Sequence, residues 1–333
     1  MRLYRGAMKK LIMLFFAMFV ATAQASELKI IVPGTNNSYF LNAQLLAPYL
    51  SKYLPEKPKI KFQSIPGAGS LIAANYLYNV APKDGSTIGI VYKAIPLVGV
   101  LKPRNTKFDP EKFVWLGSTA DGRKDAVIMW SNRSENYGDF MKKEIIVGAE
   151  SQSSADSSML IRDATGLKMK IISGYPSTGA NRLAFERKEV DSVVYSLIGI
   201  KSRKPKWLKP ESGIKALVQF GNGKVRHPEY PNVPTVFELT KDPKYIKILK
   251  VFESQFVLLR PFIAPPGVPA KRAAELREAF RKAVNDPGFK KTMSDRGIPL
   301  DPIYWEEAQK IALGVANSPK EILDIIRKRQ NIK

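Results

Sequence analysis

The stretch that most constrains the fold runs from Pro66 to Val91, PGAGSLIAANYLYNVAPKDGSTIGIV. Its first turn holds two glycines, which allow positive φ angles and let a bound group approach the backbone. Ser70 is expected to cap a helix over Leu71–Asn79, Pro82–Gly85 has the chemistry of a turn, and Thr87–Val91 is predicted to be a buried strand. A glycine-rich loop that ends in a helix N-terminus suits an anion, although such a loop is more often only a turn.

The preceding residues predict the same plan, in which an apolar strand, a polar loop and a helix follow one another. Strands are expected over Glu27–Val32 and Lys59–Ser64, and a helix over Leu41–Leu54 that Pro48 should kink or restart. This order is typical of a parallel sheet covered by helices. Because ligands gather at the carboxyl ends of such strands, the loop Pro33–Tyr39 and the glycine-rich turn should lie together.

The plan recurs after an apolar run at Ala126–Trp130, where we expect the chain to enter a second lobe. A later apolar run, Ser254–Arg260, is expected to return it to the first lobe, and the remainder is predicted to be helical, beginning with Ala270–Val284. The predicted elements of the second lobe are strands over Glu144–Gly148, Lys168–Ile172 and Val190–Leu197, and helices over Ala155–Thr165 and Ala180–Arg187. The sequence therefore predicts an α/β protein of two lobes.

The first 25 residues have the features of a cleaved export signal. Four basic residues precede an apolar core, Leu11–Val20, and Ala23-Gln24-Ala25 matches a cleavage site. The apolar core is too short to span a bilayer, which takes about 20 residues. We therefore expect cleavage before Ser26 and a mature protein outside the cytoplasm.

The chain has no cysteine and a single histidine, His227. The lack of cysteine excludes disulfides, thiolate catalysis and zinc–thiolate sites, and one histidine argues against histidine metal clusters. A serine hydrolase would need a base beside its nucleophile, and no nucleophile-elbow motif precedes His227. We therefore predict a protein that is not an enzyme, and neither a cofactor nor a metal is expected.

The net charge is +23, from 53 Lys and Arg against 30 Asp and Glu, and +19 without the export signal. Such a surplus suits nucleic acid, an anionic membrane surface or the steering of an anionic solute. The basic residues are spread along the chain apart from a denser run at Lys201–Lys209. No nucleic-acid partner is expected, and a general polyanion-binding protein is an alternative that fits the charge but not the two lobes.

Several short motifs, in order along nearly the whole mature chain, resemble those of the extracytoplasmic solute-binding proteins of tripartite tricarboxylate transporters, the Bug family. They are Pro66–Ser70 with Ala81–Gly85, Phe108–Pro110, Tyr230–Thr235, Ala264–Pro269 and Asn285–Pro287. One stretch, Arg187–Asp191, departs from the family, because charged residues stand where a glycine usually precedes Val-Asp.

The resemblance implies a two-lobed periplasmic-binding-protein type II fold with two crossover strands as hinges, in a monomer. Residues 26–125 and 255–333 would form lobe 1 and residues 126–254 lobe 2, with the crossovers near Ala126–Trp130 and Ser254–Arg260. It further implies a protein that holds a small organic anion, a carboxylate for which aromatic and dicarboxylic acids are candidates, and delivers it to the membrane subunits of a secondary transporter. A receptor that presents the same ligand to a sensor stays an open alternative.

Members of this family grip one carboxylate with backbone groups and hydroxyls of loops that face each other between the lobes. Carried over to this chain, and joined to the predicted strand ends, the candidate ligand-binding residues are Asn37, Ser38, Tyr39, Gly67, Ala68, Gly69, Tyr92, Lys93, Ser153, Ser154, Tyr175, Thr178, Gly179 and Tyr195. We expect hydroxyl and N–H groups to neutralise the carboxylate, with no obligatory Arg or Lys. Lys93 is either a cation at this site or, the more common case, a solvated surface lysine.

The first loop departs from the family's Pro-Gly-Gly followed by Thr-Asp. Here it is Pro33–Phe40, which lacks the acidic residue and has two aromatic residues, Tyr39 and Phe40. A site that loses a carboxylate and gains rings should accept amino groups less well, and bulkier or aromatic acids better.

Overall fold

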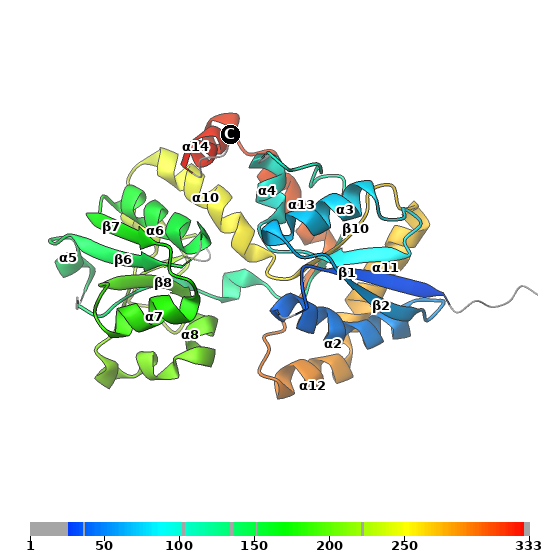
Figure 1. Cartoon of the computed structure of the whole chain (residues 1–333), viewed down its shortest axis with the longest axis horizontal. Coiled ribbons are helices and arrows are strands. Elements are labelled where there is room, and N and C mark those ends of the chain that lie inside the picture. Colours follow the sequence, from blue (N-terminus) through cyan, green and yellow to red (C-terminus); the bar gives the residue numbers. More distant parts are fainter. Residues whose placement is uncertain are drawn as a thin grey trace, which may run out of the picture.

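The computed structural model describes residues 26–35, 37–101, 104–133, 136–150, 152–220 and 223–329. The predicted export signal lies outside these residues. The chain folds into two α/β lobes, which Figure 1 shows side by side, and the predicted fold class is thereby confirmed. In the part of the chain that is described, no helix is both long and apolar enough to cross a membrane.

The first lobe is built on a six-stranded mixed sheet. Its strands, in spatial order, are β11 (Ile303–Tyr304), β4 (Val114–Ser118), β10 (Pro261–Ala264), β3 (Thr87–Ile90), β1 (Glu27–Val32) and β2 (Lys59–Ser64). β1 pairs in parallel with β2 and β3, whereas β10 is antiparallel to β3 and β4, and β11 to β4. The three parallel strands are those predicted from the sequence.

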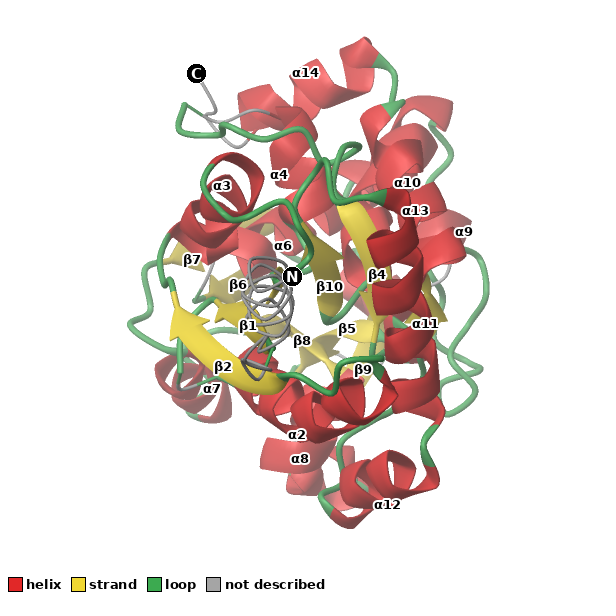
Figure 2. Cartoon of the chain, turned by 90° about the vertical axis from the view of Figure 1, so that its right-hand side faces the viewer, coloured by secondary structure: helices red, strands yellow, loops and turns green. Residues whose placement is uncertain are grey.

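Alternate residues of β1 enter two different cores, one on each face of this sheet. Leu28, Ile30 and Val32 pack with α2 (Ser38–Tyr53) and α11 (Ala270–Asn285), whereas Ile31 packs with α3 (Leu71–Asn79) and α13 (Trp305–Ala316). Figure 2 shows α3 above the sheet and α2 below it. Helix α2 is continuous through Pro48, so of the two outcomes expected there, a kink or a restart, the restart is wrong.

The second lobe has a five-stranded sheet. Its strands, in spatial order, are β7 (Met169–Ser173), β6 (Ile145–Ala149), β8 (Ser192–Ser196), β5 (Val127–Ser131) and β9 (Lys215–Phe220). β6 is parallel to β7 and β8, and β5 is antiparallel to β8 and β9. Helix α6 (Gln152–Thr165) covers one face, and α7 (Thr178–Glu186) and α8 (Leu197–Arg203) cover the other.

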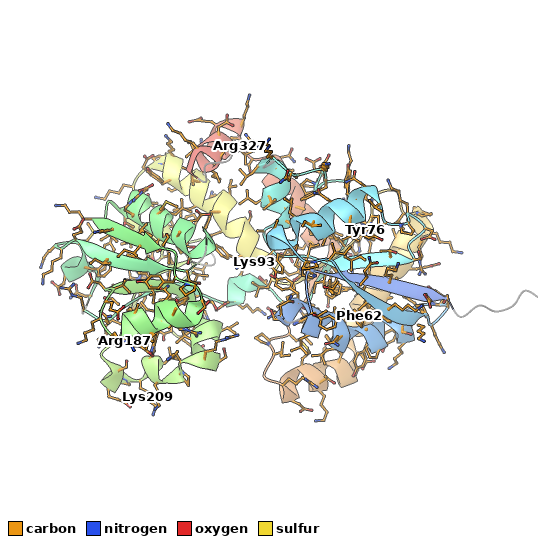
Figure 3. All side chains as sticks on the ribbon, in the orientation of Figure 1. Phe62, Tyr76, Lys93, Arg187, Lys209 and Arg327 are labelled. Carbon is orange, nitrogen blue, oxygen red and sulfur yellow. The ribbon has the colours of Figure 1, made fainter. Side chains whose placement is uncertain are left out.

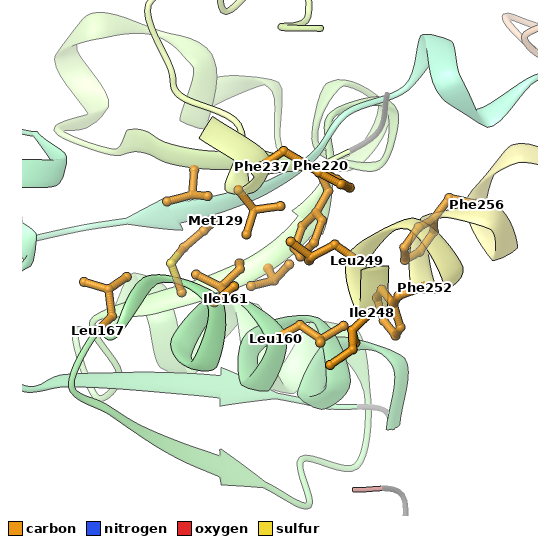
Figure 4. Close-up of a cluster of buried hydrophobic side chains, with 14 of the residues drawn as sticks. Met129, Leu160, Ile161, Leu167, Phe220, Phe237, Ile248, Leu249, Phe252 and Phe256 are labelled. Carbon is orange, nitrogen blue, oxygen red and sulfur yellow. The ribbon is translucent and has the colours of Figure 1, made fainter. Parts of the chain in front are cut away.

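A long helix, α10 (Pro243–Val257), lies at the junction of the lobes. Its side chains Ile248, Leu249, Phe252 and Phe256 belong to one buried cluster with Leu160 and Ile161 of the second lobe (Figure 4). The same cluster includes residues of α4 (Ile95–Leu101) and α14 (Lys320–Arg329). The remaining helices of the described residues are α5 (Tyr137–Phe140), α9 (Val236–Leu239) and α12 (Pro287–Asp295).

The two connections between the lobes differ in detail from the predicted crossover strands. Most of Ala126–Trp130 is strand β5, inside the second sheet, and the chain crosses just before it through a 3-10 turn at Gly122–Lys124. Ser254–Arg260 begins as the last turn of helix α10 and not as a strand. The helix prevails because its apolar side chains recur at helical spacing and bury one face. An antiparallel bridge between Asp121 and Leu258 holds the two connections together.

Candidate functional site

The carboxyl ends of the parallel strands in both lobes lie at the junction, as predicted. In the first sheet, Ile90 at the end of β3 is opposite Phe262 at the start of β10, where the chain has just returned to the lobe, and β1 and β2 run parallel to β3. In the second sheet, Ser196 at the end of β8 pairs with Val127, where β5 leaves the hinge, and β6 and β7 run parallel to β8. The loops that follow these six strands therefore share one region between the lobes.

The loop after β1 places an aromatic ring at this region. Asn37 Oδ1 accepts hydrogen bonds from the N–H groups of Tyr39 and Phe40, each at 3.0 Å, so its oxygen caps α2. Ser38 is the first residue of the helix and is exposed. The Tyr39 ring lies 4.5 Å from that of Tyr92 between centroids, and burial raises the pKa of Tyr39 to about 12. Tyr39 therefore stays a neutral hydroxyl at physiological pH.

The glycine-rich turn after β2 is strained and tied to the end of β3. The φ angles of Gly67, Ala68, Gly69 and Ser70 are 122°, 45°, 59° and 71°, although two of these residues carry a Cβ. Ser70 stands in the N-cap position of α3, but its side chain makes no capping bond; the buried hydroxyl accepts instead from Tyr92 N at 3.0 Å. Left-handed residues other than glycine cost free energy and concentrate at functional sites. The exposed backbone of Gly67–Gly69 is thereby fixed beside the tyrosine pair.

Lys93 follows directly after Tyr92 and is half-buried at the junction of the lobes (Figure 3). Its Nζ lies 4.2 Å from the ring centroid of Phe256 in α10. Burial lowers the pKa of Lys93 to about 8, Asp125 opposes this shift, and the positive charge of Arg260 adds to it. Lys93 is therefore not a solvated surface lysine, which was the more common case considered from the sequence.

Arg260 is a second cation at the junction, and the sequence analysis did not single it out. It follows α10 and is half-buried, and its backbone N donates to Ser118 Oγ at 3.1 Å. Its Nε is buried and has no hydrogen-bond partner among the described residues. Burial lowers the pKa of Arg260, and Tyr39 and Asp125 are the groups that oppose this shift. The signal in the sequence is that Arg260 is the only charged residue in the apolar run Phe256–Ala264.

The acidic group nearest to these cations, Asp125, is held by the second lobe. Its Oδ1 accepts from Ile198 N at 3.1 Å, and the Ser196 hydroxyl also bonds the carboxylate. Burial raises the pKa of Asp125, and Lys93 acts in the opposite direction. In the described part of the chain, neither Lys93 nor Arg260 forms a salt bridge with Asp125 or any other carboxylate. Two positive charges thus lie at the junction without a paired anion.

A second group of polar side chains surrounds Glu150, directly after β6. Glu150 Oε2 accepts from Ser154 Oγ at 3.2 Å and from Asn181 Nδ2 at 3.0 Å. Asn181 Nδ2 also lies 2.8 Å from the hydroxyl of Tyr195, and burial, followed by the charge of Glu150, raises the pKa of Tyr195. Two predicted residues, Ser154 and Tyr195, are therefore brought together around a carboxylate that the sequence analysis missed.

Helix α6 begins earlier than predicted, so Ser153 and Ser154 belong to its first turn and not to a loop before it. The reason is that only two residues separate the end of β6 from the helix. The side chain of Ser153 lies outside the description. Ser154 is buried and its hydroxyl donates to Glu150, so it is already engaged.

The predicted residues around α7 take other roles. Ser177 caps this helix, accepting from Ala180 N at 3.1 Å, and the Thr178 carbonyl accepts from Arg182 Nε at 3.2 Å. Gly179 is exposed in the first turn. Tyr175 packs against the core of the second lobe. Among the described residues, no hydrogen bond or ion pair joins Tyr175 to the Glu150 group or to the two cations.

Comparison with solved structures finds the same two-lobed fold in periplasmic binding proteins. A TctC solute-binding protein from Polaromonas has a TM-score of 0.68 at 15% identity, over 92% of this chain and 100% of that chain. MatC from Rhodopseudomonas palustris, with bound malate, has a TM-score of 0.59 at 17% identity, over 89% and 98% of the two chains. An R. palustris protein with adipate has a TM-score of 0.59 at 17% identity, over 93% and 99%.

These likenesses confirm the fold that the sequence resemblance implied. No family model matches the chain, and no curated protein matches its sequence.

Proposed function

We propose that this chain is a periplasmic solute-binding protein, related to the receptors of tripartite tricarboxylate transporters, that captures a small organic anion between its lobes. The observation that carries this proposal is the pair of unpaired cations, Lys93 and Arg260, at the region where the carboxyl ends of both sheets meet. Charged groups withdrawn from water are costly unless an opposite charge compensates them. A ligand carboxylate would provide that charge.

The groups around the cations suit a carboxylate. The Nε of Arg260 is a free donor, and a guanidinium binds carboxylates through parallel hydrogen bonds. A hydrogen bond to a charged group contributes about 1.5–3 kcal/mol, so two or three of them would hold a small acid. The rings of Tyr39 and Tyr92 offer an apolar wall beside the charges. This arrangement replaces the expectation that hydroxyl and backbone groups alone neutralise the ligand.

The backbone N–H groups of Gly67–Gly69 and of the first turn of α7 are proposed as additional hydrogen-bond donors to the ligand. Both have N–H groups at the junction-facing end of a helix, where the dipole favours an anion. Malate and adipate, the ligands of two proteins with the same fold, are dicarboxylates. A dicarboxylate is therefore the first ligand class to test.

The location, domain limits, oligomeric state and transport role are proposed from the family resemblance. We propose that the protein is exported to the periplasm, with cleavage before Ser26, and that it is a monomer whose lobes divide at residues 125 and 255. It would deliver the unaltered ligand to membrane subunits of a secondary transporter. Binding without chemistry fits the surroundings of His227, whose Nδ1 accepts from Glu229 N at 3.2 Å within its own loop.

A thermal-shift screen of the mature protein against mono- and dicarboxylates tests this function. A ligand that binds only the native state adds RT ln(1 + [L]/Kd) to the free energy of unfolding and so raises the melting temperature. We expect at least one acid to raise it in the wild type and not in Arg260→Met. Arg277→Met is the matched control, because Arg277 is also half-buried but belongs to α11. If no acid raises the melting temperature and only polyanions bind, the proposed function is wrong.

A further inference from the structure

The carboxylate of Glu150 lies at the carboxyl end of β6, on the edge of the second sheet that faces the junction. Its Oε2 is held by two neutral donors, Ser154 Oγ and Asn181 Nδ2, and the neutral hydroxyl of Tyr195 also contacts it. In the described residues no lysine or arginine pairs with it, although the chain carries a large excess of both. A negative charge is thus fixed in orientation and left without a counter-charge.

Buried residues of the second lobe hold the Glu150 carboxylate in position. Asn181 is fully buried, and its Nδ2 reaches both Glu150 and Tyr195. The lack of a side chain at Gly148 permits this, because a Cβ there would lie 2.1 Å from Asn181 Oδ1. Arg182, which follows Asn181 in the chain, directs its Nε to the Thr178 carbonyl, and its charge acts on the Tyr195 hydroxyl. These contacts hold Glu150 in place but do not neutralise it.

The two lobes therefore present opposite charges to the same region. Lys93 follows β3, the strand next to β10, with which the chain re-enters the first lobe. In the second sheet, β8 is next to β5, with which the chain enters this lobe. β6, which ends just before Glu150, is one strand further out. The positive charges lie close to the hinge and the negative charge lies farther from it.

We propose that the ligand is an amino acid or another small acid that carries an ammonium group, with its carboxylate at Arg260 and Lys93 and its ammonium at Glu150. This inference rests on the proposed function and narrows its ligand class. The missing acidic residue of the first loop predicted poorer acceptance of amino groups, and Glu150 supplies such a residue from the opposite lobe. A free ammonium has three donors, which the carboxylate of Glu150 and the hydroxyl of Tyr195 can accept.

Calorimetric titration with matched pairs of acids tests the inference. The pairs are L-aspartate with succinate, L-glutamate with glutarate, and 4-aminobutyrate with butyrate, each differing by one amino group. We expect the amino member of at least one pair to bind the wild type at least tenfold more tightly than its partner. In Glu150→Gln that preference should fall at least tenfold, while the acid without the amino group binds as before or more tightly. Glu211→Gln, an exposed carboxylate of the same lobe, is the control and should change neither.

The outcomes separate this inference from the proposed function. Binding of succinate, glutarate or butyrate as tight as that of every amino partner would overturn the ammonium site and leave an anion receptor standing. An amino preference that survives in Glu150→Gln would also overturn it, because another group would then bind the ammonium. If no acid of either kind binds, both are wrong. A melting curve of ligand-free Glu150→Gln shows whether this variant folds. If it does not, Glu150→Asp replaces it, because this variant keeps the charge and shortens the side chain. Glu150→Asp must then weaken amino-acid binding at least threefold, or the inference is wrong.

Discussion

The ammonium nitrogen of Lys93 lies 4.2 Å from the ring centroid of Phe256, which joins the end of β3 in the first lobe to the last turn of α10. Cation–π contacts of this kind contribute about 0.5–2 kcal/mol, more where the cation is shielded from water. The ring satisfies the charge only in part, because the pKa of Lys93 stays lowered to about 8. Lys93 is therefore held in place at the junction, and its positive charge remains only partly compensated.

The first testable consequence concerns pH. In the ligand-free protein burial lowers the pKa of Lys93 from 10.5 to about 8, so above pH 8 an increasing fraction of this side chain is neutral. A bound carboxylate favours the charged form and raises the pKa again, so binding takes up a proton. We expect affinity to fall as the pH rises from 8 to 10, and proton uptake at pH 8.5 in titrations with buffers of different ionisation enthalpy. Uptake that persists in Lys93→Met would assign the proton to another group.

The second consequence contrasts two arginines. Arg260 has a buried Nε without a partner, whereas Arg277 donates to Trp115 O and Gln309 Oε1 and lies 3.8 Å from the Trp305 ring centroid. Replacing Arg277 by methionine removes satisfied contacts and should lower the free energy of unfolding by about 1–3 kcal/mol. Arg260→Met removes an unsatisfied donor and should leave the ligand-free stability unchanged or raise it by about 1 kcal/mol. Urea unfolding measures both, and a loss of stability in Arg260→Met equal to that in Arg277→Met would show that Arg260 is already paired.

The third consequence concerns the hinge. Gly122 lies in the first connection, where a Cβ would come 1.7 Å from the carbonyl oxygen of Phe256 in the second connection. Because backbone cannot yield as a flexible side chain does, Gly122→Ala must push the two connections apart. We expect a loss of at least about 2 kcal/mol of stability, as for severe overpacking, and a changed radius of gyration in small-angle scattering.

Gly314 in α13 is the matched control for this substitution, because a Cβ there meets nothing within 4 Å. Gly314→Ala should be neutral or should stabilise the helix by about 0.5–1 kcal/mol. Equal effects of the two substitutions would show that the contact between the connections does not constrain the lobes.

Much of the fold could be predicted because its strands carry local signals. The strands β1, β2 and β3 and the helices α3 and α11 lie within a residue or two of their expected bounds, since apolar runs are bounded there by turn residues. The end of α10 was wrongly expected to be a strand, because Ser254–Arg260 was considered apart from Ile248, Leu249 and Phe252. These residues, with Phe256, form one helical stripe.

The site was predicted less completely, for a physical reason. Loops at strand ends can be located from the order of elements, and Tyr39, Tyr92, Lys93, Ser154 and Tyr195 do lie at the expected edges. Whether a charge is paired depends on residues far apart in the chain, such as Arg260 and Asp125, or Glu150 and Asn181. No local pattern contains that information, so Arg260 and Glu150 emerge only from the folded structure, whereas Lys93 was already a candidate from the sequence.

The proposed function is tested most directly by titrating the tightest-binding acid of the screen into four proteins: the wild type, Lys93→Met, Arg260→Met and Ser154→Ala. We expect each cation variant to lose at least tenfold in affinity, because each removes a charge that the carboxylate compensates. Ser154→Ala should lose less, since the Ser154 hydroxyl already donates to Glu150. If both cation variants bind like the wild type while Ser154→Ala loses binding, hydroxyl and backbone groups hold the anion and the assignment to Lys93 and Arg260 is wrong.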